Sequence, residues 1–238
     1  MTHTVLIIGA SRGLGHAMAG EFATRGWRVI GTVRDETVRT PLHELSDHAA
    51  GRVSVERLDM NKPEELTALH QRLAHGQDGA QIDILLLNAG TTAAQQTPIG
   101  EVSPADFLHV MTTNVLGPMR VIETLEHLVA PGGLIAAMSS GQGSITNNTA
   151  GGREVYRASK AALNMSMRSF VARQASTSGG ADRAYLLVAP GWIRTDLGGA
   201  EAPYTIEEST PILVDLLISR LGQPGLAYLD RFGDTVPW

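Results

Sequence analysis

Apolar runs alternate with helical stretches along almost the whole chain. The runs are continuous and rich in leucine and β-branched residues, a pattern typical of strands that are buried on both faces of a sheet. They predict strands at residues 3–10, 27–33, 52–60, 82–90, 132–140 and 183–191, and a short seventh strand near 226–229.

The stretches between these runs have the periodicity of helices. They predict helices at residues 14–25, 63–74, 104–129, 154–175 and 205–221. Pro63 opens the second of them, and Gly117-Pro118 predicts a bend inside the third. Strict alternation of β and α segments indicates an α/β fold, namely a doubly wound parallel sheet of about seven strands with helices on both faces. We expect residues 1–238 to form a single domain.

Composition and charge narrow the possible partners. Hydrophobic residues make up 43% of the chain and charged residues 18%, and the net charge of −5 disfavours nucleic acid and anionic membranes as partners. The N-terminal residues predict neither a signal peptide nor a membrane span. The chain has no cysteine, which fits a reducing cytoplasm. Its eight histidines show no metal-ligand spacing, so we expect no metal site.

The first predicted strand ends in a glycine-rich turn, GASRGLG. In doubly wound sheets, ligands lie beyond the carboxyl ends of the strands, and glycines between a strand and a helix let the backbone approach a pyrophosphate. The alternative is a tight turn without a ligand. We interpret the turn as a nucleotide site whose candidate residues are Gly9, Ser11, Arg12, Gly13, Leu14 and Gly15.

The second predicted strand ends beside Arg34, and Arg12 lies in the glycine-rich turn. Two guanidinium groups at one corner suit a dianionic 2′-phosphate, so NADP(H) is the preferred cofactor and NAD(H) stays possible. Two alternatives remain open. Asp35 could be the acid that binds the ribose of NAD, or both arginines could be solvated surface residues.

The third and fourth predicted strands also end in polar groups. Asp59-Met60 follows the third strand, where a carboxylate can accept from an adenine amino group. Asn88-Ala89-Gly90 follows the fourth strand and is expected beside the ribose and the nicotinamide. Each could instead be an ordinary turn, since Asn, Asp and Gly are common in turns.

Tyr156 and Lys160 lie four residues apart near the start of a predicted helix, which makes them neighbours on one face. The pair is either a chance surface contact or a phenol arranged to give up a proton near neutral pH. A free phenol has a pKa of about 10, and a nearby cation lowers it.

Seven motifs now point to a family. In order and spacing, GASRGLG, LDM, NAG, TTNVLGP, MSSGQGS, YRASK and APGWIRTD resemble the motif series of the short-chain dehydrogenase/reductases, over about residues 5–238. The closing segments, including RFGDTVPW, resemble the C-factor/sniffer-type carbonyl reductases. The resemblance implies a Rossmann-type fold and a cytoplasmic oxidoreductase.

The resemblance also implies a role for each member of a catalytic tetrad. Tyr156 would protonate the carbonyl oxygen, and Lys160 would lower the pKa of Tyr156 and bind the nicotinamide ribose. Ser140, preferred over Ser139, would orient the substrate oxygen, and Asn114 would hold a water that links Lys160 to solvent. The segment between Ser140 and Tyr156 is longer than is common in the family.

The segment after the sixth predicted strand is implied to contact the cofactor through Pro190, Gly191, Ile193 and Thr195. Trp192 either lines the substrate pocket or packs beneath the loop. Residues 197–209 are expected to form a lid over the active site.

The expected function is that of an NADPH-dependent carbonyl reductase acting on small-molecule aldehydes and ketones. The alternatives are an alcohol dehydrogenase that uses NAD or NADP, and a C-factor-like signalling protein that retains dinucleotide binding. We also expect a homodimer or homotetramer, with Met119, Val121 and Met165 left over from the core for a contact between copies.

Overall fold

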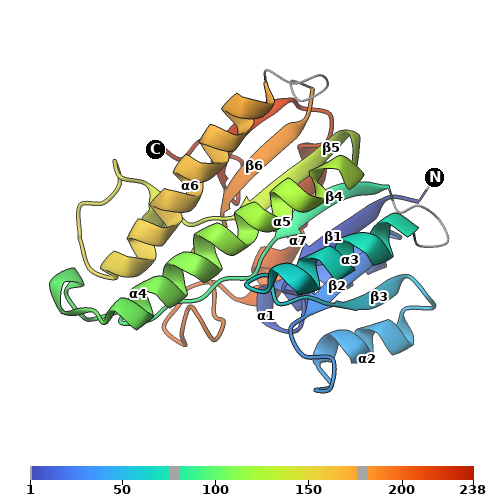
Figure 1. The fold of residues 1–238 in the computed structure, drawn as a ribbon, viewed down its shortest axis with the longest axis horizontal. Coiled ribbons are helices and arrows are strands. Elements are labelled where there is room, and N and C mark those ends of the chain that lie inside the picture. The colour runs from blue at the N-terminus through green and yellow to red at the C-terminus, as the bar shows by residue number, and fades with distance from the viewer. Residues whose placement is uncertain (1, 76–80, 176–181) are drawn as a thin grey trace.

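The computed structural model describes residues 2–75, 81–175 and 182–238, and these contain one sheet of seven parallel strands (Figure 1). The strands lie in the order β3-β2-β1-β4-β5-β6-β7. Their bounds are β1 Thr4–Ile8, β2 Arg28–Val33, β3 Val53–Arg57, β4 Ile82–Leu87, β5 Val129–Met138, β6 Ala184–Ala189 and β7 Gly225–Asp230. The predicted doubly wound sheet is confirmed.

Helices cover both faces of this sheet (Figure 1). They are α1 Gly13–Thr24, α2 Pro41–His48, α3 Pro63–His75, α4 Pro104–Met111, α5 Gly117–Leu125, α6 Glu154–Gln174 and α7 Ile206–Ser219. One apolar core joins the sheet to α1, α2 and α7 through side chains such as Phe22 and Leu217. A second core joins the other face to α3, α5 and α6 through Leu69, Ile122 and Phe170.

The strand order reverses at β1, which pairs with β2 on one side and β4 on the other. The connection after β1 leads to β2 on one side, and the connection after β4 leads to β5 on the other side. The two connections therefore separate at the carboxyl end of the sheet. The crevice that results lies beyond Ile8 and Leu87, where the glycine-rich turn and the Asn88-Ala89-Gly90 turn begin.

Helix α2 was not predicted from the sequence. It is only eight residues long and contains only two leucines, Leu42 and Leu45, so its apolar pattern is short. Thr40 and His43 form a capping box, and Pro41 occupies the first turn. These are the local signals that could have located it.

The long helix predicted over residues 104–129 is interrupted. Helix α4 passes into a π-helical segment, Thr112–Leu116, before α5 begins at Gly117. Pro118 has no N–H to donate to the carbonyl of Asn114, so the regular α-helical ladder cannot continue there. The predicted bend is therefore an interruption that places Asn114 in the widened segment.

The residues predicted for a contact between copies do not all reach the surface. Val121 is fully buried in the second core, because the face of α5 that packs on the sheet includes it, so that part of the prediction is wrong. Met119 is half-buried, and Met165 is 64% exposed.

No helix in the described part of the chain is long and apolar enough to cross a membrane.

Candidate active site

A cleft of about 540 Å³ opens at the carboxyl ends of the strands. It runs from the glycine-rich turn to Tyr156 and is lined by most of the site residues that the sequence predicted. Those residues are Gly9, Ser11, Arg12, Gly13, Leu14, Arg34, Asp59, Met60, Asn88, Ala89, Gly90, Ser140, Tyr156, Lys160, Pro190, Gly191, Trp192, Ile193 and Thr195. Gly15 and Asn114 lie behind this lining.

The glycine-rich turn depends on two glycines for different reasons. Gly9 has a φ of +89°, in the left-handed region that favours glycine. A Cβ on Gly15 would come within 2.1 Å of the carbonyl oxygen of Gly9, so only glycine lets the start of α1 approach the strand end. Asn88 stabilises the same turn, since its Nδ2 donates a hydrogen bond to the Gly9 carbonyl at 2.8 Å.

Arg12 and Arg34 both line the cleft with exposed side chains. The Nε atom of Arg12 forms an ion pair with Asp196 at 2.9 Å. Asp35 instead accepts hydrogen bonds from the hydroxyl and the amide of Thr37, which lower the pKa of its carboxyl group. This geometry favours the two arginines over Asp35 as the groups that meet a cofactor.

Asp59 lines the cleft, and two hydrogen bonds restrain its conformation. Its amide donates to Glu65 at 2.8 Å, and its Oδ1 accepts from the amide of Asn61 at 3.0 Å. The carboxylate is half-buried and lies beside Met60 at the end of the segment after β3. It is therefore positioned as an acceptor in the half of the cleft next to Arg34.

Ser139 and Ser140 have different surroundings at the end of β5. Ser139 is buried, and its hydroxyl donates to Oδ1 of Asn164 at 2.6 Å. The Oγ atom of Ser140 accepts from the amide of Gln142 at 3.1 Å, and its side chain hydrogen-bonds to Tyr156. The arrangement favours Ser140 as the serine that meets a substrate.

Tyr156 is held by α6 with only 8% of its surface exposed. Burial raises the pKa of its phenol, while the hydrogen bond to Ser140 and the charge of Arg153 act to lower that pKa. A phenol in this state is protonated at neutral pH. It can serve as an acid.

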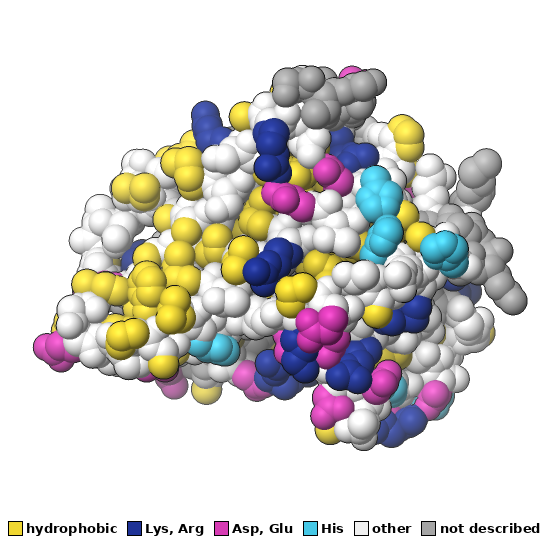
Figure 2. Space-filling view, viewed as in Figure 1, with side chains coloured by type: hydrophobic (Ala, Val, Ile, Leu, Met, Phe, Trp, Pro, Cys, Tyr) yellow, Lys and Arg dark blue, Asp and Glu magenta, His cyan; other side chains and the backbone are white. Residues whose placement is uncertain are grey.

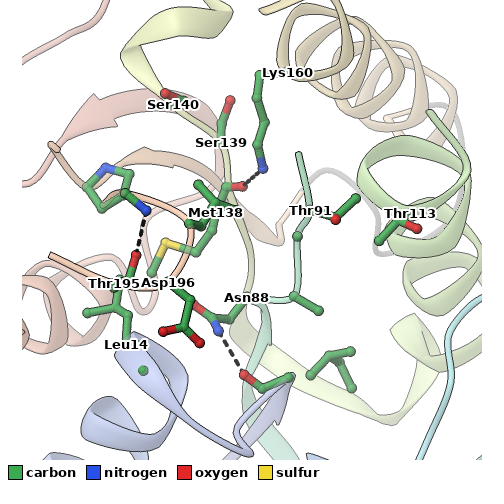
Figure 3. Close-up of a pocket in the computed structure, with 18 of the residues that line it drawn as sticks. Leu14, Asn88, Thr91, Thr113, Met138, Ser139, Ser140, Lys160, Thr195 and Asp196 are labelled. Carbon is green, nitrogen blue, oxygen red and sulfur yellow. Dashed lines mark hydrogen bonds between the residues drawn. The ribbon is translucent and has the colours of Figure 1, made fainter. Parts of the chain in front are cut away.

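Lys160 contacts the ring of Tyr156 and not its hydroxyl. The Nζ atom lies 5.7 Å from the ring centroid and donates to the backbone carbonyl of Met138 at 2.7 Å (Figure 3). Burial lowers the pKa of Lys160 to about 8. The expected lowering of the Tyr156 pKa by Lys160 is absent here, because the ammonium group is directed at β5.

The side chain of Asn114 is fully engaged. Its Oδ1 accepts from the amide of Thr91 at 2.8 Å, and its Nδ2 donates to the Thr91 carbonyl and to Ser159. A Cβ on Gly90 would lie 3.5 Å from Oδ1 of Asn114 and 3.6 Å from Nζ of Lys160. These are ordinary van der Waals distances, so the backbone at Gly90 lies beside both residues.

The predicted lid is only partly present. Leu197 and Gly198 line the cleft, and the indole N–H of Trp192 donates to the Gly198 carbonyl at 2.7 Å. Trp192 is 49% exposed and forms part of the cleft wall, so it lines the pocket. The end of the predicted lid, from Ile206, is the first turn of α7 and packs as a helix.

The cleft also contains residues that the sequence reasoning missed. Thr91, His109, Thr113, Gln142 and Arg153 all line it. Arg153 has a φ of +50°, a left-handed conformation that costs a residue with a side chain about 1–3 kcal/mol. Thr113 and Gln142 lie inside the TTNVLGP and MSSGQGS motifs, so those motifs could have located them. No motif marks Thr91, His109 or Arg153, although Arg153 follows two glycines in a polar loop directly before the Tyr156 helix. No group of three or more potential metal ligands lies together within the described ranges.

The chain is similar in sequence to a known family and to a protein of known name. The family model for short chain dehydrogenases matches residues 3–203. The chain is 33% identical to C-signal from Myxococcus xanthus over 159 residues, covering 66% of this chain and 93% of that protein.

Solved structures also match over the full length of both chains. A short-chain dehydrogenase/reductase from Burkholderia multivorans with bound NADP is 54% identical, with a TM-score of 0.94. A carbonyl reductase from Pseudomonas aeruginosa PAO1 in complex with NADP is 32% identical, with a TM-score of 0.88.

Proposed function

This chain belongs to the short-chain dehydrogenase family and is an oxidoreductase that acts on carbonyl or alcohol groups of small molecules, and we propose that it reduces carbonyl compounds with NADPH. One observation carries the proposal. The hydroxyl groups of Ser140 and Tyr156 meet in a cleft whose other end is a glycine-rich turn with two exposed arginines.

The residues of the cleft fit NADPH. The close approach of Gly15 to Gly9 leaves a bare backbone surface at the start of α1, where a pyrophosphate would bind. Arg12 and Arg34 would hold the 2′-phosphate, and Asp59 would accept from the adenine amino group. Gly90, Gly191, Ile193 and Thr195 would surround the nicotinamide half. NADP in the similar Burkholderia and Pseudomonas structures supports this assignment. When bound, NADPH supplies the hydride.

Tyr156 and Ser140 act on the substrate oxygen. Oγ of Ser140 accepts from the amide of Gln142, and its hydroxyl would donate to the carbonyl oxygen of a bound substrate. The phenol of Tyr156 donates to the same oxygen and transfers its proton there. Its raised pKa keeps the proton on Tyr156 at neutral pH, which is the protonation state that carbonyl reduction requires.

Lys160 and Asn114 prepare the site for repeated turnover. Lys160 lies against the Tyr156 ring with a pKa of about 8, so it is mostly cationic at neutral pH. Its ammonium group would bind a ribose hydroxyl of the cofactor. Asn114, with its backbone carbonyl in the π-helical segment, would hold a water through which Tyr156 regains a proton.

The assembly would be a homodimer or a dimer of dimers. Figure 2 shows hydrophobic side chains gathered over α4, α5 and α6. An apolar groove there is lined by Met111, Val115, Leu116, Met119, Met165 and Phe170, with Glu123 and Arg173 at its rim. A two-fold axis would place this surface against the same surface of a second copy.

The absence of cysteine favours a reducing compartment such as the cytoplasm.

Loss of NADPH absorbance across a panel of aldehydes and ketones tests the proposed reaction. We expect carbonyl-dependent oxidation of NADPH by the purified chain. If every carbonyl is inert while NADPH still binds, the proposal is wrong, and a signalling role of the kind named for the Myxococcus relative is favoured.

A further inference from the structure

Arg153 places a positive charge in the substrate half of the cleft. It immediately precedes α6, and its guanidinium carbon lies 5.3 Å from the centroid of the Tyr156 ring. It lines the cleft together with Ser140, Gln142 and Tyr156. A guanidinium group stacked on an aromatic face is restrained in orientation, so its N–H groups are directed before a ligand arrives.

The charge of Arg153 has no counter-ion among the described residues. Its Nε is buried without a hydrogen-bond partner, and no carboxylate in the described ranges forms an ion pair with it. Nearby groups are engaged elsewhere. Glu154 accepts from the amide of Ile99, Arg157 donates to the carbonyl of Gly152, and Asp196 pairs with Arg12.

A guanidinium at the wall of a cleft without a counter-ion would be compensated by an anion on a ligand, which its terminal N–H groups would bind. We infer that Arg153 binds a carboxylate on the carbonyl substrate, which makes oxo acids the substrate class of this cleft. The inference rests on the proposed carbonyl reductase activity. A carbonyl oxygen at the Tyr156 hydroxyl and a carboxylate at Arg153 would belong to one small molecule, because the guanidinium lies over the same ring that carries the hydroxyl.

The fork of N–H groups on arginine matches the two oxygens of a carboxylate and not a neutral ester. The test therefore compares 2-oxo, 3-oxo and 4-oxo acids of increasing chain length with their methyl esters, using NADPH as the reductant. For the unmodified enzyme we expect kcat/KM to be at least about tenfold higher for the best acid than for its ester.

Substitution of Arg153 should change this preference. Arg153→Met should lower the acid-to-ester ratio of kcat/KM by about 10- to 100-fold, the range expected for lost hydrogen bonds to a charged group. Arg153→Lys should retain part of the ratio, since it keeps the charge and loses the fork. The matched control, Arg157→Met, removes a neighbouring guanidinium that does not line the cleft, and it should leave the ratio unchanged.

The ratio separates anion binding from the effect of Arg153 on Tyr156, because a change in the acidity of Tyr156 acts on acid and ester alike. Equal losses on acid and ester in Arg153→Met would overturn the inference, as would an unmodified enzyme that reduces neutral carbonyls but does not prefer acids. If no carbonyl of either kind is reduced, the proposed reductase activity itself fails, which is a different outcome.

Discussion

The ammonium group of Lys160 donates a hydrogen bond to the backbone carbonyl of Met138, 2.7 Å away, and is buried between α6 and β5. Burial lowers the pKa of Lys160 from 10.5 to about 8. The active-site lysine is therefore anchored to the sheet in the absence of ligands, and it has a proton that folding makes easier to remove.

This burial predicts a pH dependence of stability. Between about pH 8 and 10.5 the unfolded chain keeps a proton on Lys160 that the folded chain loses, so the free energy of unfolding should rise with pH in that window. Relative to Lys160→Met, we expect a gain of about 2 kcal/mol from pH 7 to pH 10. Urea unfolding of both proteins without cofactor measures it. Parallel pH profiles would contradict the buried position of the ammonium group.

The two adjacent serines should separate activity from stability. Ser140→Ala removes a donor to the substrate oxygen, and we expect turnover to fall about 100-fold while the melting temperature changes little. Ser139→Ala leaves Oδ1 of Asn164 without its partner, so it should cost about 1–3 kcal/mol of stability and retain most turnover. Steady-state kinetics and denaturant unfolding of the pair decide this, and the reverse pattern would exchange the two assignments.

The parallel sheet and the cleft at its carboxyl end follow from sequence patterns, because continuous apolar runs and glycine-rich strand ends are local signals. Helix α2 was not predicted because it is only eight residues long with two leucines, and the cap at Thr40 was the local signal that could have located it. Val121 forms an i, i+3, i+4, i+7 stripe with Pro118, Ile122 and Leu125, so the periodicity within α5 already indicated that it packs on the sheet. The prediction treated residues 104–129 as one helix, and the π-helical segment interrupts that helix before α5.

The sequence predicted which residues form the site, but it did not predict their pKa values. Tyr156 and Lys160 share a helical face, as their spacing requires. The pKa of the phenol also depends on its burial and on the hydrogen bond that Lys160 makes, and here Lys160 donates to the carbonyl of Met138. Arg153 reaches the cleft through a left-handed backbone conformation, which the sequence before α6 does not specify.

Cofactor preference should depend on Arg34. Arg34→Ala should weaken NADPH binding by about 10- to 100-fold, because charge-assisted hydrogen bonds to the 2′-phosphate are lost. NADH, which lacks that phosphate, should bind much as before. Arg39→Ala is the matched control, since Arg39 is exposed, pairs with Asp47 and does not line the cleft. Titration calorimetry of NADPH and NADH with the unmodified chain and the two variants measures all six affinities. Equal weakening of both dinucleotides by Arg34→Ala would mean that Arg34 does not read the phosphate.

The apolar groove over α4, α5 and α6 should govern assembly. The unmodified chain should scatter light as a multiple of its 25.3 kDa mass at micromolar concentration. Met165→Glu would place a charge in the groove, and we expect it to shift the particle toward 25.3 kDa. Val38→Glu, at an exposed apolar residue away from the groove, should leave the mass unchanged. A monomeric unmodified chain would rule out the pairing.

The central claim is that this cleft reduces a carbonyl group with hydride from NADPH and a proton from Tyr156. Its most direct test is product analysis with NADPH deuterated at the transferring position. The account predicts one deuterium on the alcohol carbon for each NADPH consumed, and Tyr156→Phe should bind NADPH normally while forming product about 10²- to 10⁴-fold more slowly. Alcohol without deuterium, or a Tyr156→Phe variant of normal rate, would contradict it.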